Sequence, residues 1–387
     1  MTIDRKYIPH IYLIAGEESG DRLGGLLMQS LKHITTENIH FSGVGGKSMI
    51  AEGIQSLFPM DDLAVMGLFE ILPRIPKLID RLNYVVKDIR EVMPDLLVTI
   101  DSPDFNFRVV RRLVGYDIPC VHYVAPTVWA WRPRRAKKIS HTIDHLLTLF
   151  PFEPHYFERY GLACTYVGHP VLKSGADKAD QESFRSNRKI NKDANLIAII
   201  PGSRKGEVIR HLPIFAKAAK ILHGQFPNIE IIIPTIEATR SVVELEVAAW
   251  HMPVHLTEND HDKYAAFATA QAAIAASGTV TLELAMTGTP AVIGYKLAPV
   301  TAFLVKHLVK VRYASLVNLI LEQEAIPEYL LDKCRAIPLA VAIRDLLNNR
   351  DLRNTQKNAY KAALALLGHN EFDPSRRASE VILKMLS

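Results

Sequence analysis

The sequence predicts an α/β protein with two parallel β-sheets, each flanked by helices. Three observations carry this prediction. Short apolar runs alternate with segments of helical periodicity along most of the 387 residues. A polar stretch poor in aromatic residues covers 173–195, and the alternation starts again at residue 196. A chain of this length also exceeds one ordinary core, so two domains are expected.

Composition and charge narrow the class of protein. Hydrophobic residues make up 48% and charged residues 22% of the chain, which is typical of a soluble globular protein. The net charge of +5 favours anionic partners without choosing among them. The three cysteines are far apart, so we expect a reducing compartment and no cysteine metal site. We expect neither a signal peptide nor a spanning helix.

The first half carries the expected βα units in order. Strands are predicted at 11–15, 39–44, 96–100, 121–124, 146–149 and 165–167. Two phosphate-binding patterns fail in this half. A P-loop would need glycine where Phe41 stands, and the dinucleotide pattern that starts at Gly43 ends on Ser48. The nucleotide site is therefore expected elsewhere in the chain.

The second half repeats the alternation. Strands are predicted at 196–200, 229–234, 254–256, 272–276 and 291–293, and helices at 298–311, 328–349 and 351–386. Because ligands in such folds bind at the carboxyl ends of strands, we expect the groups there to line one site. Asp101, Arg204 and Ser277 each follow a predicted strand.

The stretch 276–295 has the strongest local signal. Ser277, Gly278 and Thr279 form a turn that opens a helix, where free N–H groups and hydroxyls suit an anion. Glu283 lies one helical turn further on, where its carboxylate suits the two hydroxyls of a ribose. The turn predicts a nucleotide diphosphate site, and the alternative is an ordinary strand–turn–helix with a surface glutamate.

Seven stretches in collinear order resemble the lipid-A-disaccharide synthase family. They are GEESGD (16–21), DSPDFN (101–106), HYV (122–124), VWAWR (128–132), PGSR (201–204), ASGT (276–279) and VNL (317–319). The resemblance implies a GT-B fold, in which two Rossmann-like domains with parallel sheets face a central cleft. It divides the chain into an acceptor and membrane-docking domain (1–172), a linker (173–195), a UDP-sugar domain (196–365) and a C-terminal helix (366–387).

The resemblance also implies the reaction. An inverting, metal-independent transferase without a cofactor would move 2,3-diacylglucosamine from UDP-2,3-diacylglucosamine to 2,3-diacylglucosamine 1-phosphate (lipid X). The products would be the β(1→6) disaccharide 1-phosphate and UDP. The family places such a protein in the cytoplasm, peripherally on the cytoplasmic face of the inner membrane. A homodimer is left open, and the sequence does not indicate the acyl-chain length that the enzyme prefers.

Asp101 is the predicted general base, because it ends a strand and Pro103 stiffens the following turn. Glu17 is the second candidate and Asp104 the third. The alternative role for Asp101 is to cap the helix that follows it.

The donor is expected on the second domain. The substrate-binding residues predicted there are Gly202, Ser203, Arg204, Ser277, Gly278, Thr279, Glu283 and Asn318. Arg204 is also predicted to act in catalysis, since its guanidinium suits a diphosphate leaving group. The alternative is a surface arginine that pairs with Glu207.

Two apolar stretches predict membrane docking on anionic lipid. In 65–82, apolar residues recur at helical spacing opposite charged ones, and 296–312 is apolar with basic residues and no carboxylates. The docking residues predicted are Leu68, Phe69, Leu72, Lys306 and Lys310. Alternatively, both helices pack on the domain cores.

The basic run 132–138 is not expected to bind nucleic acid. Trp129 and Trp131 precede its charges rather than interleave with them, and no nucleic-acid motif accompanies it. Acidic lipid headgroups or the phosphate of the acceptor suit it better.

Two rival functions stay open at this point. A UDP-N-acetylglucosamine 2-epimerase would have a similar nucleotide half, but it leaves the apolar surface stretches unexplained. A non-catalytic protein that binds membrane surfaces leaves the paired nucleotide-like turns unexplained.

Overall fold

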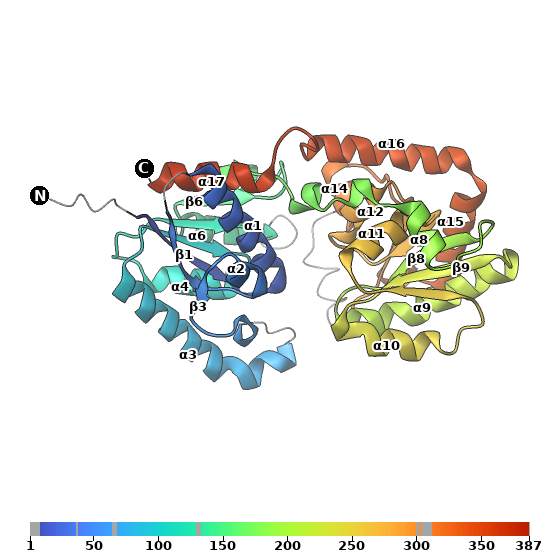
Figure 1. The fold of residues 1–387 in the computed structure, drawn as a ribbon, viewed down its shortest axis with the longest axis horizontal. Coiled ribbons are helices and arrows are strands. Elements are labelled where there is room, and N and C mark those ends of the chain that lie inside the picture. The colour runs from blue at the N-terminus through green and yellow to red at the C-terminus, as the bar shows by residue number, and fades with distance from the viewer. Residues whose placement is uncertain are drawn as a thin grey trace, which may run out of the picture. The chain divides into compact units, whose positions relative to one another are not determined.

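The computed structural model describes residues 8–35, 38–63, 68–128, 133–298, 302 and 312–386, without the side chains of 68–72 and 133. The chain forms two compact units (Figure 1). Unit 1 comprises residues 1–170 and 370–387, and unit 2 comprises residues 171–369.

Unit 1 is built on a seven-stranded parallel sheet of order β3-β2-β1-β4-β5-β6-β7. Its strands are β1 (His10–Ala15), β2 (His40–Val44), β3 (Gln55–Ser56), β4 (Leu96–Ile100), β5 (Cys120–Tyr123), β6 (His145–Thr148) and β7 (Ala163–Tyr166). The central strands β1, β4 and β5 are almost entirely buried, as continuous apolar strands between two helical layers must be. The strand order reverses direction between β1 and β4, which makes the ends of these two strands the expected ligand site.

Helices cover both faces of this sheet. They are α1 (Glu18–Ile34), α2 (Lys47–Ala51), α3 (Leu68–Val92), α4 (Pro103–Arg112), α6 (Pro133–Ser140), α7 (His155–Glu158) and α17 (Pro374–Leu386), with a 3₁₀ turn η1 (Met60–Asp62). Helix α17, the last of the chain, packs against α1, the first helix (Figure 1). The chain therefore returns from unit 2 to complete unit 1.

The carboxylate of Asp21 joins the first two βα units. It is buried and accepts the backbone N–H groups of Gly46 (2.7 Å), Ser48 (2.8 Å) and Met49 (3.0 Å) at the start of α2. A Cβ atom at Gly46 would lie only 2.9 Å from the Asp21 carboxyl carbon, so this contact requires glycine. The motif GEESGD therefore ends on a structural residue.

Replacing Asp21 with alanine should lower the free energy of unfolding by about 1–3 kcal/mol, because three N–H groups would lose a charged acceptor. Urea denaturation followed by circular dichroism measures this change. Glu18 is exposed in the same first turn of α1, so Glu18→Ala is the matched control and should stay within about 0.5 kcal/mol of the wild type. Equal stability of both variants would contradict the role assigned to Asp21.

Unit 2 is built on a six-stranded parallel sheet of order β10-β9-β8-β11-β12-β13. Its strands are β8 (Asn195–Ile200), β9 (Ile229–Pro234), β10 (Val254–Thr257), β11 (Ala272–Ala275), β12 (Ala291–Tyr295) and β13 (Glu328–Leu330). Here the reversal of strand order lies between β8 and β11.

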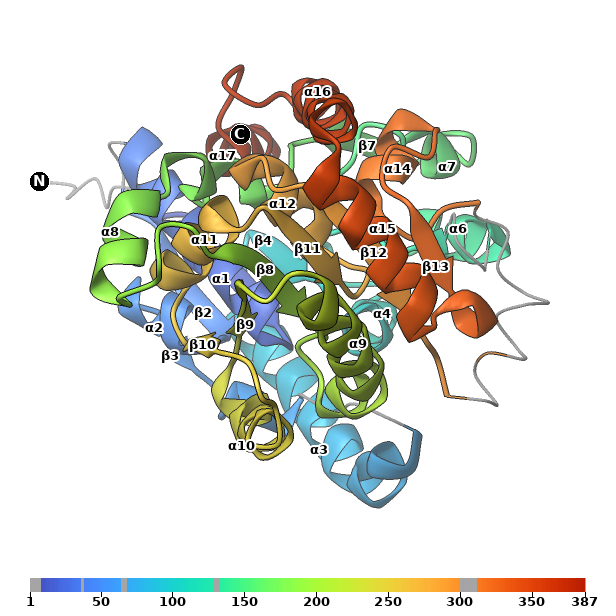
Figure 2. The ribbon, with the colours of Figure 1, turned by 90° about the vertical axis from the view of Figure 1, so that its right-hand side faces the viewer.

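Two helical layers cover the second sheet (Figure 2). Its helices are α8 (Gln181–Asn187), α9 (Lys205–Gln225), α10 (Glu237–Val247), α11 (Asp260–Thr269), α12 (Val280–Thr287), α14 (Leu316–Leu321), α15 (Ala336–Asn348) and α16 (Arg350–Leu366), with 3₁₀ turns η2 (Pro170–Lys173), η3 (Ala176–Lys178) and η4 (Leu331–Lys333). Helices α9, α10 and α15 pack together on one face, and α8, α11, α12 and α16 pack on the other (Figure 2).

The structure differs from the predicted elements in three places. The stretch 173–195, expected as a linker, forms η3 and α8, and α8 packs on α11 within unit 2. The predicted helix 328–349 begins with the strand β13, which pairs with β12. The predicted helix 351–386 is two helices, α16 and α17, which belong to different units.

Among the described residues no helix is both long and apolar enough to cross a bilayer.

Candidate functional site

The two candidate bases of unit 1 lie at the reversal point of its sheet. Ala15 of β1 pairs with Ile100 of β4, so the loops that carry Glu17 and Asp101 leave adjacent strands. The hydroxyl of Ser19, in the first turn of α1, donates a 3.1 Å hydrogen bond to Oδ2 of Asp101. The structure thus brings the motifs GEESGD and DSPDFN together.

The backbone of Asp101 is strained. Asp101 and Ser102 have φ angles of 50° and 43°, a left-handed conformation that costs a non-glycine residue about 1–2 kcal/mol. The buried Asn106 amide holds this turn by donating to the carbonyl of Asp101 (2.7 Å) and, at 3.3 Å, to that of Ile100. Strain that is stabilised in this way clusters at functional sites, so it supports a role for Asp101 beyond the fold.

Asp101 does not cap the helix that follows it. Ser102 is the N-cap residue of α4, and the Oδ1 atom of Asp101 accepts the backbone N–H of Ser102 itself (2.8 Å). A capping side chain would instead accept an N–H group from the second or third residue of the helix. The capping alternative therefore does not describe this carboxylate.

A pocket of about 300 Å³ opens beside Asp101 at the carboxyl ends of β4 and β5. Asp104, Val124 and Arg135 also line it, whereas Glu17 does not. Val124 has a φ angle of 84°, which is an outlier for a β-branched residue. Two strained loops therefore meet at this pocket. It is lined by the Asp101 carboxylate, which the Ser19 hydroxyl contacts, by the Asp104 carboxylate and by Arg135.

His122 lies in the core of unit 1. It is fully buried on β5, where Nδ1 hydrogen-bonds with the Thr99 hydroxyl (2.8 Å) and the ring packs against Phe107. Burial, aided by the charge of Arg135, lowers the pKa of His122 to about 3, so the imidazole is neutral. The burial and the hydrogen bond make His122 a structural residue. The two tryptophans of the motif VWAWR, Trp129 and Trp131, lie outside the described residues.

Two turns of unit 2 begin side by side at its own reversal point. Ile200 of β8 pairs with Ala275 of β11, so the turns 201–204 and 276–279 leave adjacent strands. Gly202 has a φ angle of 118°, and a Cβ atom there would lie 2.6 Å from the Glu207 carboxylate. The turn therefore depends on glycine at this position.

Arg204 is the exposed N-cap residue of α9, next to Ser203, which is also exposed. The Glu207 carboxylate accepts the backbone N–H of Arg204 (3.5 Å) and the Tyr295 hydroxyl (3.1 Å). Within the described part of the chain, the guanidinium of Arg204 forms no ion pair with Glu207 or with any other carboxylate. The structure therefore does not show Arg204 as a surface arginine whose guanidinium pairs with Glu207.

His211, which no sequence motif indicates, positions the first turn. The ring is buried and lies 2.8 Å from the Pro201 carbonyl through Nδ1, while Nε2 accepts the Lys296 N–H (2.9 Å). Burial lowers the pKa of His211, so the neutral ring donates at Nδ1 and accepts at Nε2. It ties the turn after β8 to the end of β12.

The turn 276–279 opens α12, as predicted. The Ser277 hydroxyl donates to the Ala314 carbonyl (2.5 Å), Gly278 has a φ angle of 148°, and Thr279 is the exposed N-cap residue. The hydroxyl of Ser277 thereby fixes the turn to the segment before α14.

Glu283 has two partners that the sequence did not indicate. Its Oε1 atom accepts from the Lys263 ammonium (2.9 Å) and the Tyr264 hydroxyl (3.3 Å), both on α11. Burial opposes the charge of Lys263, but Glu283 and Asp260 outweigh it and raise the pKa of the ammonium. Lys263 and Tyr264 therefore hold the carboxylate of Glu283 in one orientation.

Asn318 is buried and holds a loop rather than facing an open site. Its amide donates to the Ile326 carbonyl and to Glu328 (both 2.8 Å), and its oxygen accepts the N–H groups of Ala325 and Ile326 (both 2.9 Å). All four hydrogen-bonding positions of the amide are occupied. Asn318, a predicted member of the nucleotide pocket, thus has no hydrogen-bonding position of its side chain left for a ligand.

Glu328 links this loop to the turn at Ser277. Its carboxylate accepts the N–H groups of Ala314 and Ser315 (both 2.8 Å), and Ala314 in turn accepts from Ser277. Burial raises the pKa of Glu328 although these hydrogen bonds oppose the shift.

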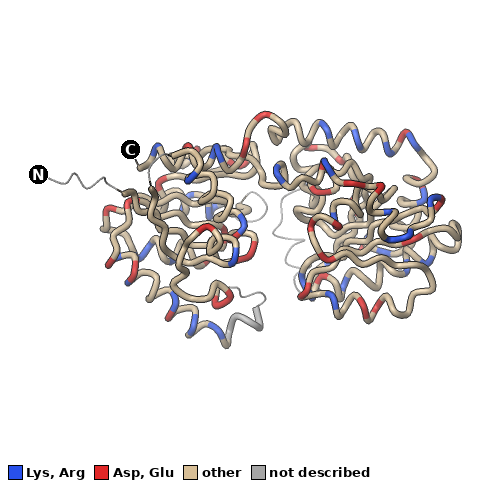
Figure 3. Tube along the Cα trace, viewed as in Figure 1, with Lys and Arg blue, Asp and Glu red and all other residues tan. Residues whose placement is uncertain are grey.

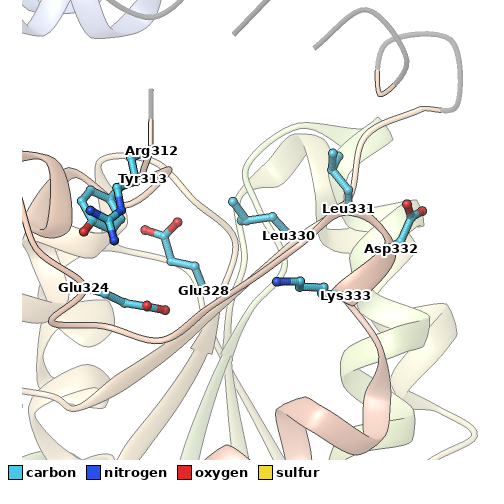
Figure 4. A pocket seen from close by; sticks show the side chains of 8 residues that line it. All are labelled: Arg312, Tyr313, Glu324, Glu328, Leu330, Leu331, Asp332 and Lys333. Carbon is cyan, nitrogen blue, oxygen red and sulfur yellow. The ribbon is translucent and has the colours of Figure 1, made fainter. Parts of the chain in front are cut away.

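Glu328 also faces a pocket of about 420 Å³, with Arg312, Tyr313 and Glu324 on one side and Leu331 and Asp332 on the other (Figure 4).

The residues predicted to dock on membrane fall outside what the structure describes. This applies to the side chains of Leu68, Phe69 and Leu72 and to Lys306 and Lys310. The described part of the same helix, α3, exposes Ile75 (38%) and Ile79 (44%). Basic and acidic residues are interspersed along the described part of α3 (Figure 3).

Comparisons with known proteins identify the family. The family model described as lipid-A-disaccharide synthetase matches residues 11–382. The lipid-A-disaccharide synthase of Rhodospirillum centenum is 47% identical over 379 residues, which cover 97% of this chain and 94% of that protein.

Solved structures with the same fold include enzymes of two activities. A UDP-GlcNAc 2-epimerase from Neisseria meningitidis bound to UDP-GlcNAc aligns with a TM-score of 0.65 and 11% identity over 97% of this chain and 99% of that one. CalG4, the calicheamicin glycosyltransferase, aligns with a TM-score of 0.60 and 13% identity over 98% of each chain. At identities this low, a structural match shows the fold alone. The two alignments confirm the predicted GT-B architecture.

Proposed function

This chain belongs to the lipid-A-disaccharide synthase family, and from that premise we propose how its two units share one inverting glycosyl transfer. Unit 2 binds UDP-2,3-diacylglucosamine, and unit 1 binds the acceptor, lipid X, beside its general base. The epimerase reading is set aside because relatives that cover 97% of the chain are named for the synthase.

The observation that carries the proposal is the placement of Asp101 in a pocket, on a strained turn that the buried Asn106 holds. In the reaction, the C6 hydroxyl oxygen of the acceptor attacks the anomeric carbon of the donor. The bond from that carbon to the β-phosphate oxygen of UDP breaks, and the hydroxyl proton passes to the Asp101 carboxylate. Attack from the face opposite UDP gives the β configuration.

The leaving group needs positive charge, which Arg204 and the start of α12 supply. The guanidinium offers several N–H donors to the diphosphate, and the turn 277–279 adds backbone N–H groups. Glu283, held by Lys263, accepts the ribose hydroxyls through its second oxygen. Asn318 and His211 touch no substrate in this scheme, and they position the two turns.

One assay separates the proposal from its rivals. Purified protein is supplied with lipid X and with either the diacylated donor or UDP-N-acetylglucosamine, and the release of UDP is followed. We expect UDP release with the diacylated donor only. Interconversion of the unacylated UDP-sugar without an acceptor would favour the epimerase, and binding without turnover would favour a non-catalytic protein.

We further propose that the first part of α3 docks the protein on the cytoplasmic face of the inner membrane. Side chains from 73 to 80 are exposed except Leu78, whereas Val85 and Ile89 further along the helix are fully buried in unit 1. This first part of the helix exposes the apolar Ile75 and Ile79 beside basic residues, one of which, Lys77, pairs with Asp62. Exposed apolar side chains flanked by basic ones suit an anionic bilayer surface. Leu68, Phe69, Leu72, Lys306 and Lys310 stay predicted docking residues, although they lie outside what the structure describes, and a homodimer stays open.

Replacing both Ile75 and Ile79 with serine should weaken binding to vesicles that contain phosphatidylglycerol at least about tenfold, because buried apolar area drives insertion. Co-sedimentation measures binding, and thermal denaturation checks the fold. Leu245 is 81% exposed on α10 of unit 2, so Leu245→Ser is the matched control. Unchanged vesicle binding of the double variant, or its unfolding, would contradict the docking surface.

A further inference from the structure

The pocket beside Asp101 holds one positive charge among its described lining residues, the guanidinium of Arg135. Arg135 lies on α6, its side chain is 25% exposed, and it pairs with the carboxylate of Asp104 through Nη2 at 2.5 Å. Asp104 itself is 84% exposed. An arginine that is mostly buried yet faces a pocket, with a partner on the solvent side, is poised to exchange that partner for a ligand anion.

An acid–base group and a cation that come from different elements both line this one pocket. Asp101 comes from the end of β4, and Arg135 comes from the helix after β5. The proposed acceptor has matching groups at opposite ends of one sugar ring, which are the attacking C6 hydroxyl and the phosphate on C1. Binding that phosphate to Arg135 would direct C6 toward Asp101.

Building on the proposed function, we propose that Arg135 is the specificity-determining residue that recognises the phosphate monoester of the acceptor. The phosphate displaces Asp104 from the guanidinium and accepts two parallel N–H bonds from it. The reaction does not consume this phosphate, so its binding energy orients the ring rather than driving bond cleavage. The other wall of the pocket, from Val124 to Val128, is largely apolar and carries no competing charge.

The test compares two acceptors that differ only in the phosphate, 2,3-diacylglucosamine 1-phosphate and 2,3-diacylglucosamine. For Arg135→Gln we expect kcat/KM for the phosphorylated acceptor to fall about 10- to 100-fold, as for a lost charged hydrogen bond. The value for the unphosphorylated acceptor and the KM of the donor should stay within about twofold, since neither involves the anion. Arg135→Lys keeps the charge without the fork, and it should retain part of the preference.

Two matched controls complete the experiment. Arg134 is exposed on the same helix and does not line the pocket, so Arg134→Gln should keep the full preference for the phosphate. Asp104→Asn removes the competing carboxylate and should lower the KM of the phosphorylated acceptor alone.

Three results would overturn the inference. They are an equal loss with both acceptors in Arg135→Gln, an equal loss of preference in Arg134→Gln, and loss of the preference in Arg135→Lys together with an unchanged KM in Asp104→Asn. Wild-type protein that forms no disaccharide from either acceptor would instead overturn the proposed function, and this inference with it.

Discussion

Replacing Asp101 with asparagine should lower kcat about 10²- to 10⁴-fold while the affinity for UDP stays at the wild-type value. Asparagine keeps the shape of the side chain, its oxygen can still accept the Ser102 N–H, and its NH2 group can donate to the Ser19 hydroxyl in place of accepting from it, but it cannot accept the proton of the acceptor hydroxyl. The fold should be intact, because Asp101 caps no helix. Steady-state turnover and titration with UDP measure the two quantities separately.

Glu17→Gln and Asp104→Asn are the matched comparisons for this prediction. Glu17 leaves the neighbouring strand but does not line the pocket, and Asp104 lines it from an exposed position. Neither change should reduce kcat by as much as Asp101→Asn. Near-wild-type turnover in Asp101→Asn, with a large loss in Glu17→Gln, would move the general base to Glu17.

Replacing Arg204 with alanine should weaken transition-state binding by about 2–4 kcal/mol, which corresponds to a loss of about 30- to 1,000-fold in kcat/KM. The negative charge that develops on the leaving UDP would lose its compensating guanidinium. Arg204 is exposed at the N-terminus of α9 and has no ion pair among the described residues, so the substitution should not unfold unit 2. Steady-state kinetics with the diacylated donor measure this loss.

Two controls sharpen the prediction for Arg204. Arg204→Lys should recover part of the loss, since it restores charge without the bidentate fork. Chelation with EDTA should leave the wild-type rate unchanged, because in this account the arginine and the start of α12 carry the charge. Loss of activity on chelation and its return with magnesium would contradict the account, and so would full activity of Arg204→Ala.

The strands that position both sites could be predicted because they are short apolar runs buried between two helical layers. Leu96–Ile100 and Asn195–Ile200 are such runs, so the residues that follow them could be placed at strand ends. The strand β13 was missed because Glu328, Tyr329 and Leu330 are only partly buried and carry no apolar pattern. A short edge strand of this kind forms because a neighbouring strand pairs with it. For β13 this neighbour is β12.

The residues that hold the sites could not be predicted, because their partners are distant in the sequence. His211 bonds to Lys296, and Lys263 pairs with Glu283. Asn318 was placed in the nucleotide pocket by resemblance, but a single sequence does not show that four backbone and side-chain groups occupy its amide. The sequence also predicted a helix at the end of the chain without indicating that it packs against α1.

The structure of the product distinguishes a single inverting displacement from the alternative reactions. Purified protein, UDP-2,3-diacylglucosamine and lipid X are incubated, and the lipid product is analysed by mass spectrometry and NMR. A single displacement assisted by Asp101 predicts one β(1→6)-linked disaccharide that retains the 1-phosphate, with one UDP released for each disaccharide formed. An α-linked disaccharide, or a modified UDP-sugar with no net release of UDP, would contradict the account.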